Sequence, residues 1–315
     1  MACAYKNVGL GGGLADSAGA FVEIHQDHRV WVGIGAAEVG QGLVQIAAAL
    51  AAEVLGIPIE RVEVTVGDTA RTPDGGPTTA SRQTYITGNA VRLAAEGLRQ
   101  RLAVIAAEKL NAAPDNLVFQ DGRVIRPDGH SMSFGETASL ARSKGRSLEA
   151  FYEYRAPTTV SLGQPGDAHF AYGFGTQAAQ VEVDLTTGEV KVLRLVAAHD
   201  VGRAVNPMAI EGQIEGGIMM GIGYALTEEF LVEGGYVKSD NLTRYKVPSI
   251  RHMPQVHPII LEYRASEGPF GAKGVGEVTT IPTAPAILNA IYHACGARLT
   301  RLPATPQRVL AALRK

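Results

Sequence analysis

The sequence predicts an α+β fold in two lobes, and three observations lead to this prediction. Strand-like and helix-like stretches both occur along the chain. No repeat of fixed period and no low-complexity tract is evident. An irregular stretch at 156–171 is rich in proline and glycine, which is typical of a boundary. We therefore expect lobes of about 1–165 and 166–315.

Hydrophobic patterns define the elements of the first lobe. The 43–55 stretch is dominated by apolar residues with frequent alanine, which favours a helix. The 116–127 stretch alternates in polarity and contains an Asp-Gly turn, as a hairpin does. The predicted elements, in order, are strands at 20–24 and 30–34, a helix at 43–55, a strand at 62–66, a helix at 83–110 and the hairpin at 116–127.

The second lobe begins with strands. Two strand patterns flank a Thr-Thr-Gly turn and predict a second hairpin. In order, this lobe is predicted to hold the hairpin strands at 180–184 and 189–197, a helix at 211–229, a strand at 259–263 and a helix at about 284–295. Together with the first lobe, these elements define the α+β class.

The composition excludes several classes of protein. The 315 residues, 46% of them hydrophobic, are enough to bury a substantial core. Lys and Arg number 29 against 31 Asp and Glu, so no overall basic field exists to attract nucleic acid or an anionic membrane. The segment from Met1 to Gly13 lacks the pattern of a secretory signal, and no stretch approaches the ~18 apolar residues of a membrane span. We expect a cytoplasmic location.

Potential metal-binding side chains are sparse. The only two cysteines, Cys3 and Cys295, are too few for a disulfide framework, a structural zinc site or an iron–sulfur cluster held within the chain. The eight histidines show no His-x-x-His or similar pair, so His199 and His252 are interpreted as core or loop residues. Any redox relay must therefore come from another polypeptide.

Four short turns, rich in glycine or hydroxyl side chains, precede predicted helices. A helix start offers backbone N–H groups and the positive end of its dipole, and glycine lets the backbone approach a ligand closely. Four such starts could together hold an anionic cofactor, although any one of them is more simply a helix cap. The turns are Val39-Gly40-Gln41-Gly42, Thr78-Thr79-Ala80-Ser81, Asn206-Pro207 leading to Gly212-Gln213, and Gly274-Val275-Gly276-Glu277.

The same segments form an ordered series of blocks. They are Gly35-Ala36-Ala37-Glu38-Val39-Gly40-Gln41-Gly42, Thr79-Ala80-Ser81-Arg82-Gln83-Thr84, Asp200-Val201-Gly202 with Asn206-Pro207, Gly212-Gln213-Ile214-Glu215-Gly216, and Gly271-Ala272-Lys273-Gly274-Val275-Gly276-Glu277. In this order they resemble the C-terminal half of the molybdopterin-binding subunit of the xanthine dehydrogenase and aldehyde oxidase family. The resemblance implies a two-lobed molybdopterin-binding domain with mixed sheets, and with helices whose N-termini face the cofactor.

The resemblance implies a molybdenum–molybdopterin cofactor, with the cytosine dinucleotide as one form that it can take. In this family the pterin dithiolene and non-protein ligands hold the metal, so no protein ligand to molybdenum is expected. Val39, Gly40 and Gln41 resemble the turn that meets the cofactor near the metal. The other cofactor-binding positions that the match implies are Ala80, Ser81, Thr84, Gln213 and Gly276.

Glu277 resembles the catalytic glutamate of the family. The simpler interpretation is a carboxylate stabilised by the dipole at a helix start, but the Gly-Val-Gly before it favours a base. The resemblance implies that Glu277 removes a proton from a molybdenum-bound hydroxide as its oxygen attacks an electron-poor carbon of the substrate. Hydride then passes to a sulfido ligand, and two electrons leave through other chains.

Partner chains follow from the same resemblance. Relatives carry a further half with a Phe-Gly-Gly element, so we expect a large molybdopterin subunit with the other half of the site, an iron–sulfur subunit with 2Fe–2S clusters and a FAD subunit. A split gene, as in nicotinate dehydrogenase-like enzymes with a medium molybdopterin subunit, is preferred over a truncation. The expected substrate is an N-heteroaromatic such as a purine or nicotinate, with an aldehyde as the next choice.

Two other functions stay open from the sequence. A non-catalytic scaffold subunit would complete the molybdopterin site of a partner, and the presence of Glu277 argues against it. A generic small-molecule or phosphate-binding protein is compatible with the glycine turns, but the five ordered blocks argue against it. Molybdenum analysis of the complex, together with a Glu277 variant, separates the three functions.

Overall fold

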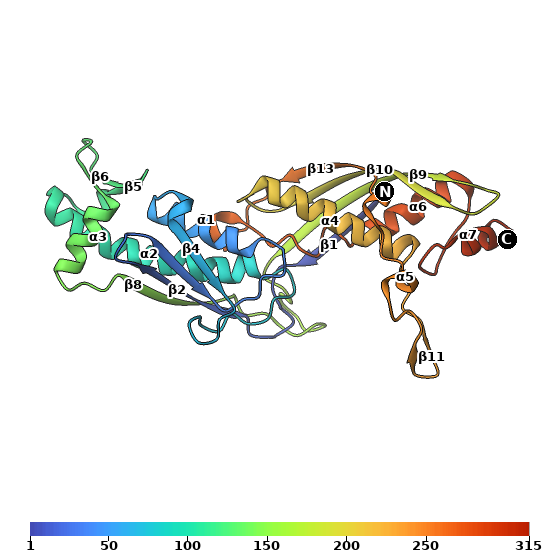
Figure 1. Cartoon of the computed structure of the whole chain (residues 1–315), viewed down its shortest axis with the longest axis horizontal. Coiled ribbons are helices and arrows are strands. Elements are labelled where there is room, and N and C mark those ends of the chain that lie inside the picture. Colours follow the sequence, from blue (N-terminus) through green and yellow to red (C-terminus); the bar gives the residue numbers. More distant parts are fainter. Residues whose placement is uncertain (315) are drawn as a thin grey trace. The chain divides into compact units, whose positions relative to one another are not determined.

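The computed structural model describes residues 1–314, which form two compact units (Figure 1). Each unit is named here for one of its helices. The α2 unit comprises Asn7–Ala171 and Arg264–Gly274. The α4 unit comprises Met1–Lys6, Tyr172–Tyr263 and the chain from Val275 onward.

These units differ from lobes of 1–165 and 166–315 in three segments, the first of which is 166–171, a part of the α2 unit. The break at Ala171 falls at the end of the predicted irregular stretch, in which no helix or strand forms. Met1–Lys6, however, belongs to the α4 unit, most of which comes from the second half of the chain. Arg264–Gly274 belongs to the α2 unit, most of which comes from the first half. The chain therefore passes between the units more than once.

A four-stranded sheet with strand order β4-β3-β2-β8 is the base of the α2 unit. The central strand β3 runs parallel to β4 and antiparallel to β2, and all of its residues are buried. A continuous apolar run such as VWVGI is typical of a strand that is buried on both of its faces. The strands are β2 (Ser17–Ile24), β3 (Val30–Ile34), β4 (Val62–Val66) and β8 (Glu149–Arg155).

Two helices, α1 (Leu43–Leu55) and α2 (Gln83–Leu110), pack against each other and against this sheet (Figure 1). Their alanine-rich and leucine-rich faces join the strands in one hydrophobic core. A small three-stranded sheet and a third helix complete the unit. They are β5 (Val118–Gln120), β6 (Arg123–Ile125), β7 (Ser131–Ser133) and α3 (Phe134–Ser143), with 3-10 turns at Ile59–Arg61, Pro114–Asn116 and Pro269–Gly271.

The α4 unit contains a sheet with strand order β1-β9-β10-β13, in which β10 runs antiparallel to β9 and parallel to β13. Helices α4 and α6 pack on it, and a second hydrophobic core lies between helices and sheet. The elements are β1 (Ala2–Asn7), β9 (Tyr172–Val183), β10 (Val190–Asp200), α4 (Pro207–Leu226), β11 (Val232–Glu233), β12 (Tyr236–Val237), α5 (Leu242–Tyr245), a 3-10 turn at Ile250–His252, β13 (Gln255–Leu261), α6 (Thr283–Cys295) and α7 (Pro306–Leu313).

The structure confirms the α+β class and most of the predicted elements. The strands at 30–34 and 62–66 and the helices at 43–55 and 83–110 match residue for residue. Both hairpins are present, and the strands of the second are longer than predicted. The strand β8 was not predicted, because it buries only one residue and so shows almost no alternation. No described helix combines the length and the apolar character needed to cross a membrane.

Two predictions about helix starts were wrong. The helix expected at 211–229 begins at Pro207, because the Asn206 side chain caps it by accepting the N–H of Ala209 at 3.1 Å. Gly274–Glu277 does not begin a helix: residues 276–282 form consecutive turns, and α6 starts only at Thr283. Glu277 is therefore a turn residue and not a helix-start carboxylate.

Candidate functional site

The loop before α1 is closed by Glu38, for which the sequence pattern predicted no role. Its carboxylate accepts the backbone N–H groups of Gly40 at 2.7 Å, Gly42 at 3.1 Å and Val44 at 3.0 Å. Partial burial opposes ionisation, but the hydrogen bonds from Val44, Gly42 and Gly40 outweigh it and lower the pKa of Glu38. The N–H groups that we expected to be open at this helix start are therefore already bound to the chain's own carboxylate.

Gln41 is oriented by the same loop. Its Oε1 accepts the N–H of Val39 at 2.7 Å, and its Nε2 donates to the carbonyl of Ala37 at 3.0 Å. A side-chain amide nitrogen carries two N–H donors, so one of them remains for a further partner. The geometry suits Gln41 for donating a hydrogen bond to a ligand.

The outer face of this loop is open. Gly40 and Gly42 adopt φ of 100° and 88°, a left-handed region that glycine enters without penalty. A Cβ atom built on either glycine would meet no atom within 4 Å. The backbone conformation requires glycine here, and the space in front of it can admit a ligand.

The turn before α2 has an unusual backbone. Ala80 and Ser81 both lie in the left-handed region, with φ of 51° and 50°. Each such residue costs on the order of 1–3 kcal/mol, so the surrounding structure must hold the turn. Two backbone contacts do so: the N–H of Gly9 donates to the carbonyl of Ala80 at 3.0 Å, and Gly274 lies so close that an added Cβ would be 1.7 Å from the carbonyl oxygen of Ser81.

No side chain caps the N-terminus of α2, whose N-cap residue is Arg82. Thr84 lies half-buried in the first turn of the helix. The backbone N–H groups at a helix start attract anions and acceptors, and here no carboxylate of the kind that Glu38 supplies to α1 takes them.

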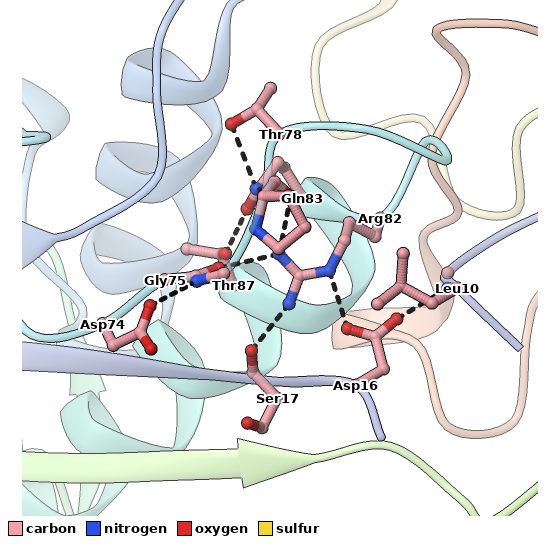
Figure 2. A network of polar contacts seen from close by, with 12 residues as sticks. Leu10, Asp16, Ser17, Asp74, Gly75, Thr78, Arg82, Gln83 and Thr87 are labelled. Carbon is pink, nitrogen blue, oxygen red and sulfur yellow. Dashed lines mark hydrogen bonds and ion pairs between the residues drawn. The ribbon is translucent and has the colours of Figure 1, made fainter. Parts of the chain in front are cut away.

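The α1 loop and the α2 turn are joined by hydrogen bonds. The Thr78 hydroxyl accepts the N–H of Ala37 at 3.0 Å and donates to its carbonyl at 3.1 Å. Gln83 donates from Nε2 to the Thr78 hydroxyl at 3.2 Å and to the backbone carbonyl of Pro77 at 3.0 Å, and the Thr87 hydroxyl donates to the side-chain oxygen Oε1 of Gln83 (Figure 2). Because Ala37 also accepts from Gln41, the two turns form one hydrogen-bonded body.

The arginine that begins α2 is itself buried. The Arg82 and Asp16 side chains are each 1% exposed and form an ion pair with Nε–Oδ1 at 2.6 Å. Arg82 also donates to the carbonyls of Gly75 at 2.7 Å, Pro77 at 2.9 Å and Ser17 at 2.7 Å (Figure 2). Removing one partner of such a pair costs about 3–5 kcal/mol, because the other charge stays buried.

Glu277 lies on the turns before α6 in the α4 unit. Its carboxylate forms an ion pair with Lys6, with Nζ–Oε2 at 3.1 Å. The Glu277 side chain is 46% exposed, whereas the Lys6 side chain is only 19% exposed. Two hydrogen bonds hold the turn: Thr280 donates its N–H to the backbone carbonyl of Glu277 at 3.1 Å, and the Thr279 hydroxyl donates to the backbone carbonyl of Gly276 at 2.9 Å. The carboxylate is therefore both anchored and reachable.

A buried polar cluster lies beneath this turn. Gln177 donates to the carbonyl of Thr279 at 2.7 Å and accepts the Thr283 hydroxyl at 2.7 Å, and it lies 3.3 Å from Nε2 of His199. Burial lowers the pKa of His199 to about 4, so this imidazole is neutral at neutral pH. His199 is thus a core residue, as interpreted from the sequence.

The comparisons with known proteins now decide the family. A family model for the molybdopterin cofactor-binding domain matches residues 1–254. The chain belongs to this family.

Individual relatives agree. The chain is 33% identical over 304 residues to the xanthine dehydrogenase molybdenum-binding subunit of Escherichia coli O157:H7, covering 93% of this chain and 39% of that protein. It is 34% identical over 328 residues to the 6-hydroxypseudooxynicotine dehydrogenase complex subunit gamma of Paenarthrobacter nicotinovorans, with 97% and 40% covered. The crystal structure of quinoline 2-oxidoreductase from Pseudomonas putida 86 matches with a TM-score of 0.89 at 27% identity, over 99% of this chain and 41% of that chain. The chain thus spans about 40% of the length of these relatives.

The residues of this molybdopterin cofactor-binding domain fit a cofactor rich in hydrogen-bonding groups. The α1 loop offers an oriented N–H of Gln41 beside the open face of Gly40 and Gly42, and the α2 turn adds a helix start that no side chain caps. Within residues 1–314, no group of three or more His, Cys, Asp or Glu side chains could hold a metal ion.

The predicted site residues fall into two sets. Val39, Gly40 and Gln41 lie with Ala80, Ser81 and Thr84 in the α2 unit, whereas Gln213, Gly276 and Glu277 lie in the α4 unit. Within the α4 unit, α4 approaches the Glu277 turn closely, because a Cβ on Gly217 would lie 2.1 Å from the Thr279 hydroxyl. Gln213 is half-buried one helical turn before Gly217, on the same face of α4.

Sequence reasoning missed the residues that hold these turns. Glu38, Arg82 and Gln83 stand inside the quoted blocks, so a polar residue next to a glycine or hydroxyl turn was an available signal. Asp16 and Gln177 had no such signal, because each acts on a segment far away in the sequence.

Proposed function

We propose that this chain forms the part of a xanthine dehydrogenase-type molybdenum hydroxylase that binds molybdopterin and supplies the catalytic base. The enzyme would insert a water-derived oxygen into an electron-poor carbon of its substrate, and it would be active only with partner chains. The observation that carries the proposal is the preformed pair of turns before α1 and α2, joined through Thr78, in a member of the molybdopterin cofactor-binding domain family.

Each turn has a distinct part in holding the cofactor. Gln41 donates its remaining amide N–H, and Gly40 lets the cofactor approach the backbone. Ala80, Ser81 and Thr84 supply the contacts at the α2 start, and Gln213 and Gly276 would contribute from the α4 unit. The bound cofactor supplies the two-electron redox chemistry.

Glu277 is proposed as the general base. Its half-exposed carboxylate accepts the proton that the water-derived oxygen loses as it attacks the substrate carbon. Lys6 balances the negative charge at 3.1 Å, and the buried Gln177–Thr279 contact keeps the turn in place. A carboxylate on an anchored turn can meet the geometric demand on a base better than one on a mobile loop.

The substrate proposed is an N-heteroaromatic compound, with an aldehyde as the alternative. The name of one similar structure, quinoline 2-oxidoreductase, supports the first choice. The partners proposed are a large molybdopterin subunit, an iron–sulfur subunit with 2Fe–2S clusters and a FAD subunit, since the relatives named above include complex subunits. The cytosine dinucleotide form of the cofactor belongs to the same proposal.

The test is Glu277→Gln in the co-purified complex, with Glu182→Gln on the exposed part of β9 as the control. The amide keeps nearly the same size but cannot accept the proton. We expect normal assembly and molybdenum content, with reduction of the cofactor by substrate slowed roughly 10²–10⁴-fold in rapid-mixing measurements. Glu182→Gln should reduce at the wild-type rate.

Three outcomes would contradict parts of the proposal. A rate for Glu277→Gln within a few-fold of wild type would leave Glu277 without a catalytic role and favour a scaffold subunit. Loss of molybdenum from the same variant would make Glu277 a structural residue. A wild-type complex without stoichiometric molybdenum would refute the binding of this cofactor altogether.

A further inference from the structure

The buried pair Arg82–Asp16 joins segments that are distant in sequence. Asp16 and Ser17 stand where β2 begins, Gly75 and Pro77 belong to the loop before α2, and Arg82 is the N-cap of α2. The Arg82 guanidinium links the start of α2 to the other two segments through four hydrogen bonds, one to Asp16 Oδ1 and three to backbone carbonyls (Figure 2). An arginine can do this because its planar fork presents five donors in fixed directions.

Asp16 extends the contact to a further segment. While its Oδ1 accepts from Arg82, its Oδ2 accepts the backbone N–H of Leu10 at 2.8 Å. The neighbouring N–H, that of Gly9, donates to the carbonyl of Ala80 at 3.0 Å. Gly9 is also closely confined, since an added Cβ would lie 2.1 Å from Phe170 and 3.0 Å from Asp16. The Gly9–Leu10 segment is therefore bonded to the α2 turn both directly and through Asp16.

The position of Arg82 gives these contacts a consequence for the turn. Ala80 and Ser81 immediately precede Arg82 and hold left-handed φ values that non-glycine residues rarely adopt. The Arg82 side chain donates to the backbone carbonyl of Pro77, at the other end of the turn. This hydrogen bond links the two ends of the 77–82 segment. The 75–77 loop wraps the guanidinium tightly: a Cβ on Gly76 would lie 3.0 Å from both terminal nitrogens.

We propose that Arg82 is a positioning residue for the α2 turn. Through Asp16 and the 75–77 loop, it keeps Ala80 and Ser81 in their left-handed conformation and holds Gly9 and Leu10 against the same turn. This inference rests on the proposed function in one respect only, namely that Ala80 and Ser81 contact the cofactor. The coupling between the turn and the Gly9–Leu10 segment stands on the contacts alone.

The test compares Arg82→Lys with Arg142→Lys in the co-purified complex. Lysine keeps the charge but is a single point donor, so it cannot reach four acceptors in different directions. Arg142 is a matched control, because it also donates to two backbone carbonyls in the α2 unit, those of Ile24 and His25, from the distant helix α3. Hydrogen exchange of the peptides that contain residues 9–10 and 80–82 is measured along with thermal unfolding and molybdenum content.

Arg82→Lys should speed exchange at residues 9–10 and 80–82 by roughly tenfold or more, the scale expected when charge-assisted hydrogen bonds are lost in a locally opening segment. It should also lower molybdenum content well beyond any effect of Arg142→Lys. Arg142→Lys should leave both readouts within about twofold of wild type. If Arg82→Lys does not accumulate as folded protein, Asp16→Asn is measured instead, with the same expectation for residues 80–82.

Unchanged exchange at residues 9–10 and 80–82 would overturn the proposal. So would equal losses of protection and molybdenum in Arg142→Lys, because the effect would then be general destabilisation of the α2 unit. If the wild-type complex holds no molybdenum, the proposed function fails, while the exchange measurement still decides whether Arg82 couples the two segments. The two failures are therefore distinguishable.

Discussion

The starts of α1 and α2 look alike in sequence but are stabilised in different ways. At α1, the Glu38 carboxylate accepts three backbone N–H groups. The loop also changes direction at Gly40 and Gly42, whose positive φ values glycine adopts without strain. At α2, no side chain caps the helix, and a strained Ala80–Ser81 turn is enclosed by backbone and by a buried arginine. The first start is held by a partly exposed carboxylate, and the second by close packing and a buried ion pair.

This difference shows that a glycine-bearing or hydroxyl-bearing turn does not by itself reveal an anion site. The dipole of α1 is already balanced by a carboxylate of the chain, so this end can offer Gln41 and the open glycine face to a cofactor, but it has less to offer a phosphate. At the start of α2 no side-chain cap is present, so its first backbone N–H groups can donate to a further acceptor. We expect the anionic part of the cofactor at α2.

The largest effect on this comparison is expected from Gly274→Ala. A Cβ there would lie 1.7 Å from the Ser81 carbonyl oxygen, a backbone atom that cannot move aside without opening the α2 turn. We expect a loss of about 3 kcal/mol in the free energy of unfolding, measured by urea denaturation. Gly42→Ala is the counterpart at α1, where only the φ of 88° is unfavourable, and should cost about 1–2 kcal/mol. Equal losses would show that the α2 start is not closely packed.

Glu38→Gln should weaken the α1 start next. The amide retains one acceptor but loses the charge that strengthens the bonds to Gly40, Gly42 and Val44, so we expect a loss of about 1.5 kcal/mol in unfolding free energy. Glu182→Gln, at an exposed position on β9, should change it by less than about 0.5 kcal/mol. A stability equal to wild type would show that the glycine turn holds α1 without Glu38.

Acid should separate the two helix starts. The pKa of Glu38 is lower in the folded chain than in the unfolded chain, so its stabilisation is fully present above the ordinary glutamate pKa. It is lost as the pH falls through the lowered folded value. The stability difference between wild type and Glu38→Gln should therefore shrink as the pH decreases, whereas the difference for Gly274→Ala should be independent of pH. A pH-independent Glu38 difference would refute the role of its charge.

Gln41→Ala should have the smallest effect on folding and a clear effect on the cofactor. Removing the amide leaves a cofactor partner without its donor, which costs on the order of 1–3 kcal/mol in cofactor binding. The loop should keep its shape, because Glu38 still binds Gly40 and Gly42. Molybdenum content of the purified complex is the measurement, with thermal unfolding as its control. Normal content and turnover would leave Gln41 as a turn residue only.

Local sequence pattern by itself determined much of this protein. The strands β3 and β4 and the helices α1 and α2 follow from their local patterns of apolar residues, and their predicted bounds match those observed. Periodicity reports which face of a segment is buried, and these segments bury theirs within one unit. The glycine turns and the ordered blocks indicated where the candidate site lies, because they are contiguous in the chain.

Tertiary structure alone decided what the turns are bound to. Arg82 and Asp16 are separated by 66 positions, Gly274 meets Ser81 from the far end of the sequence, and Lys6 pairs with Glu277 across nearly the whole chain. The helix predicted at about 284–295 is confirmed as α6, but the Gly274–Glu277 turn was wrongly expected to begin a helix for the same reason, since a Gln177–Thr279 contact that no local pattern contains holds the turns around Glu277. In the sequence, a charged residue indicates that a partner is needed, and a glycine indicates that another atom comes close. Only the folded chain shows which atom that is.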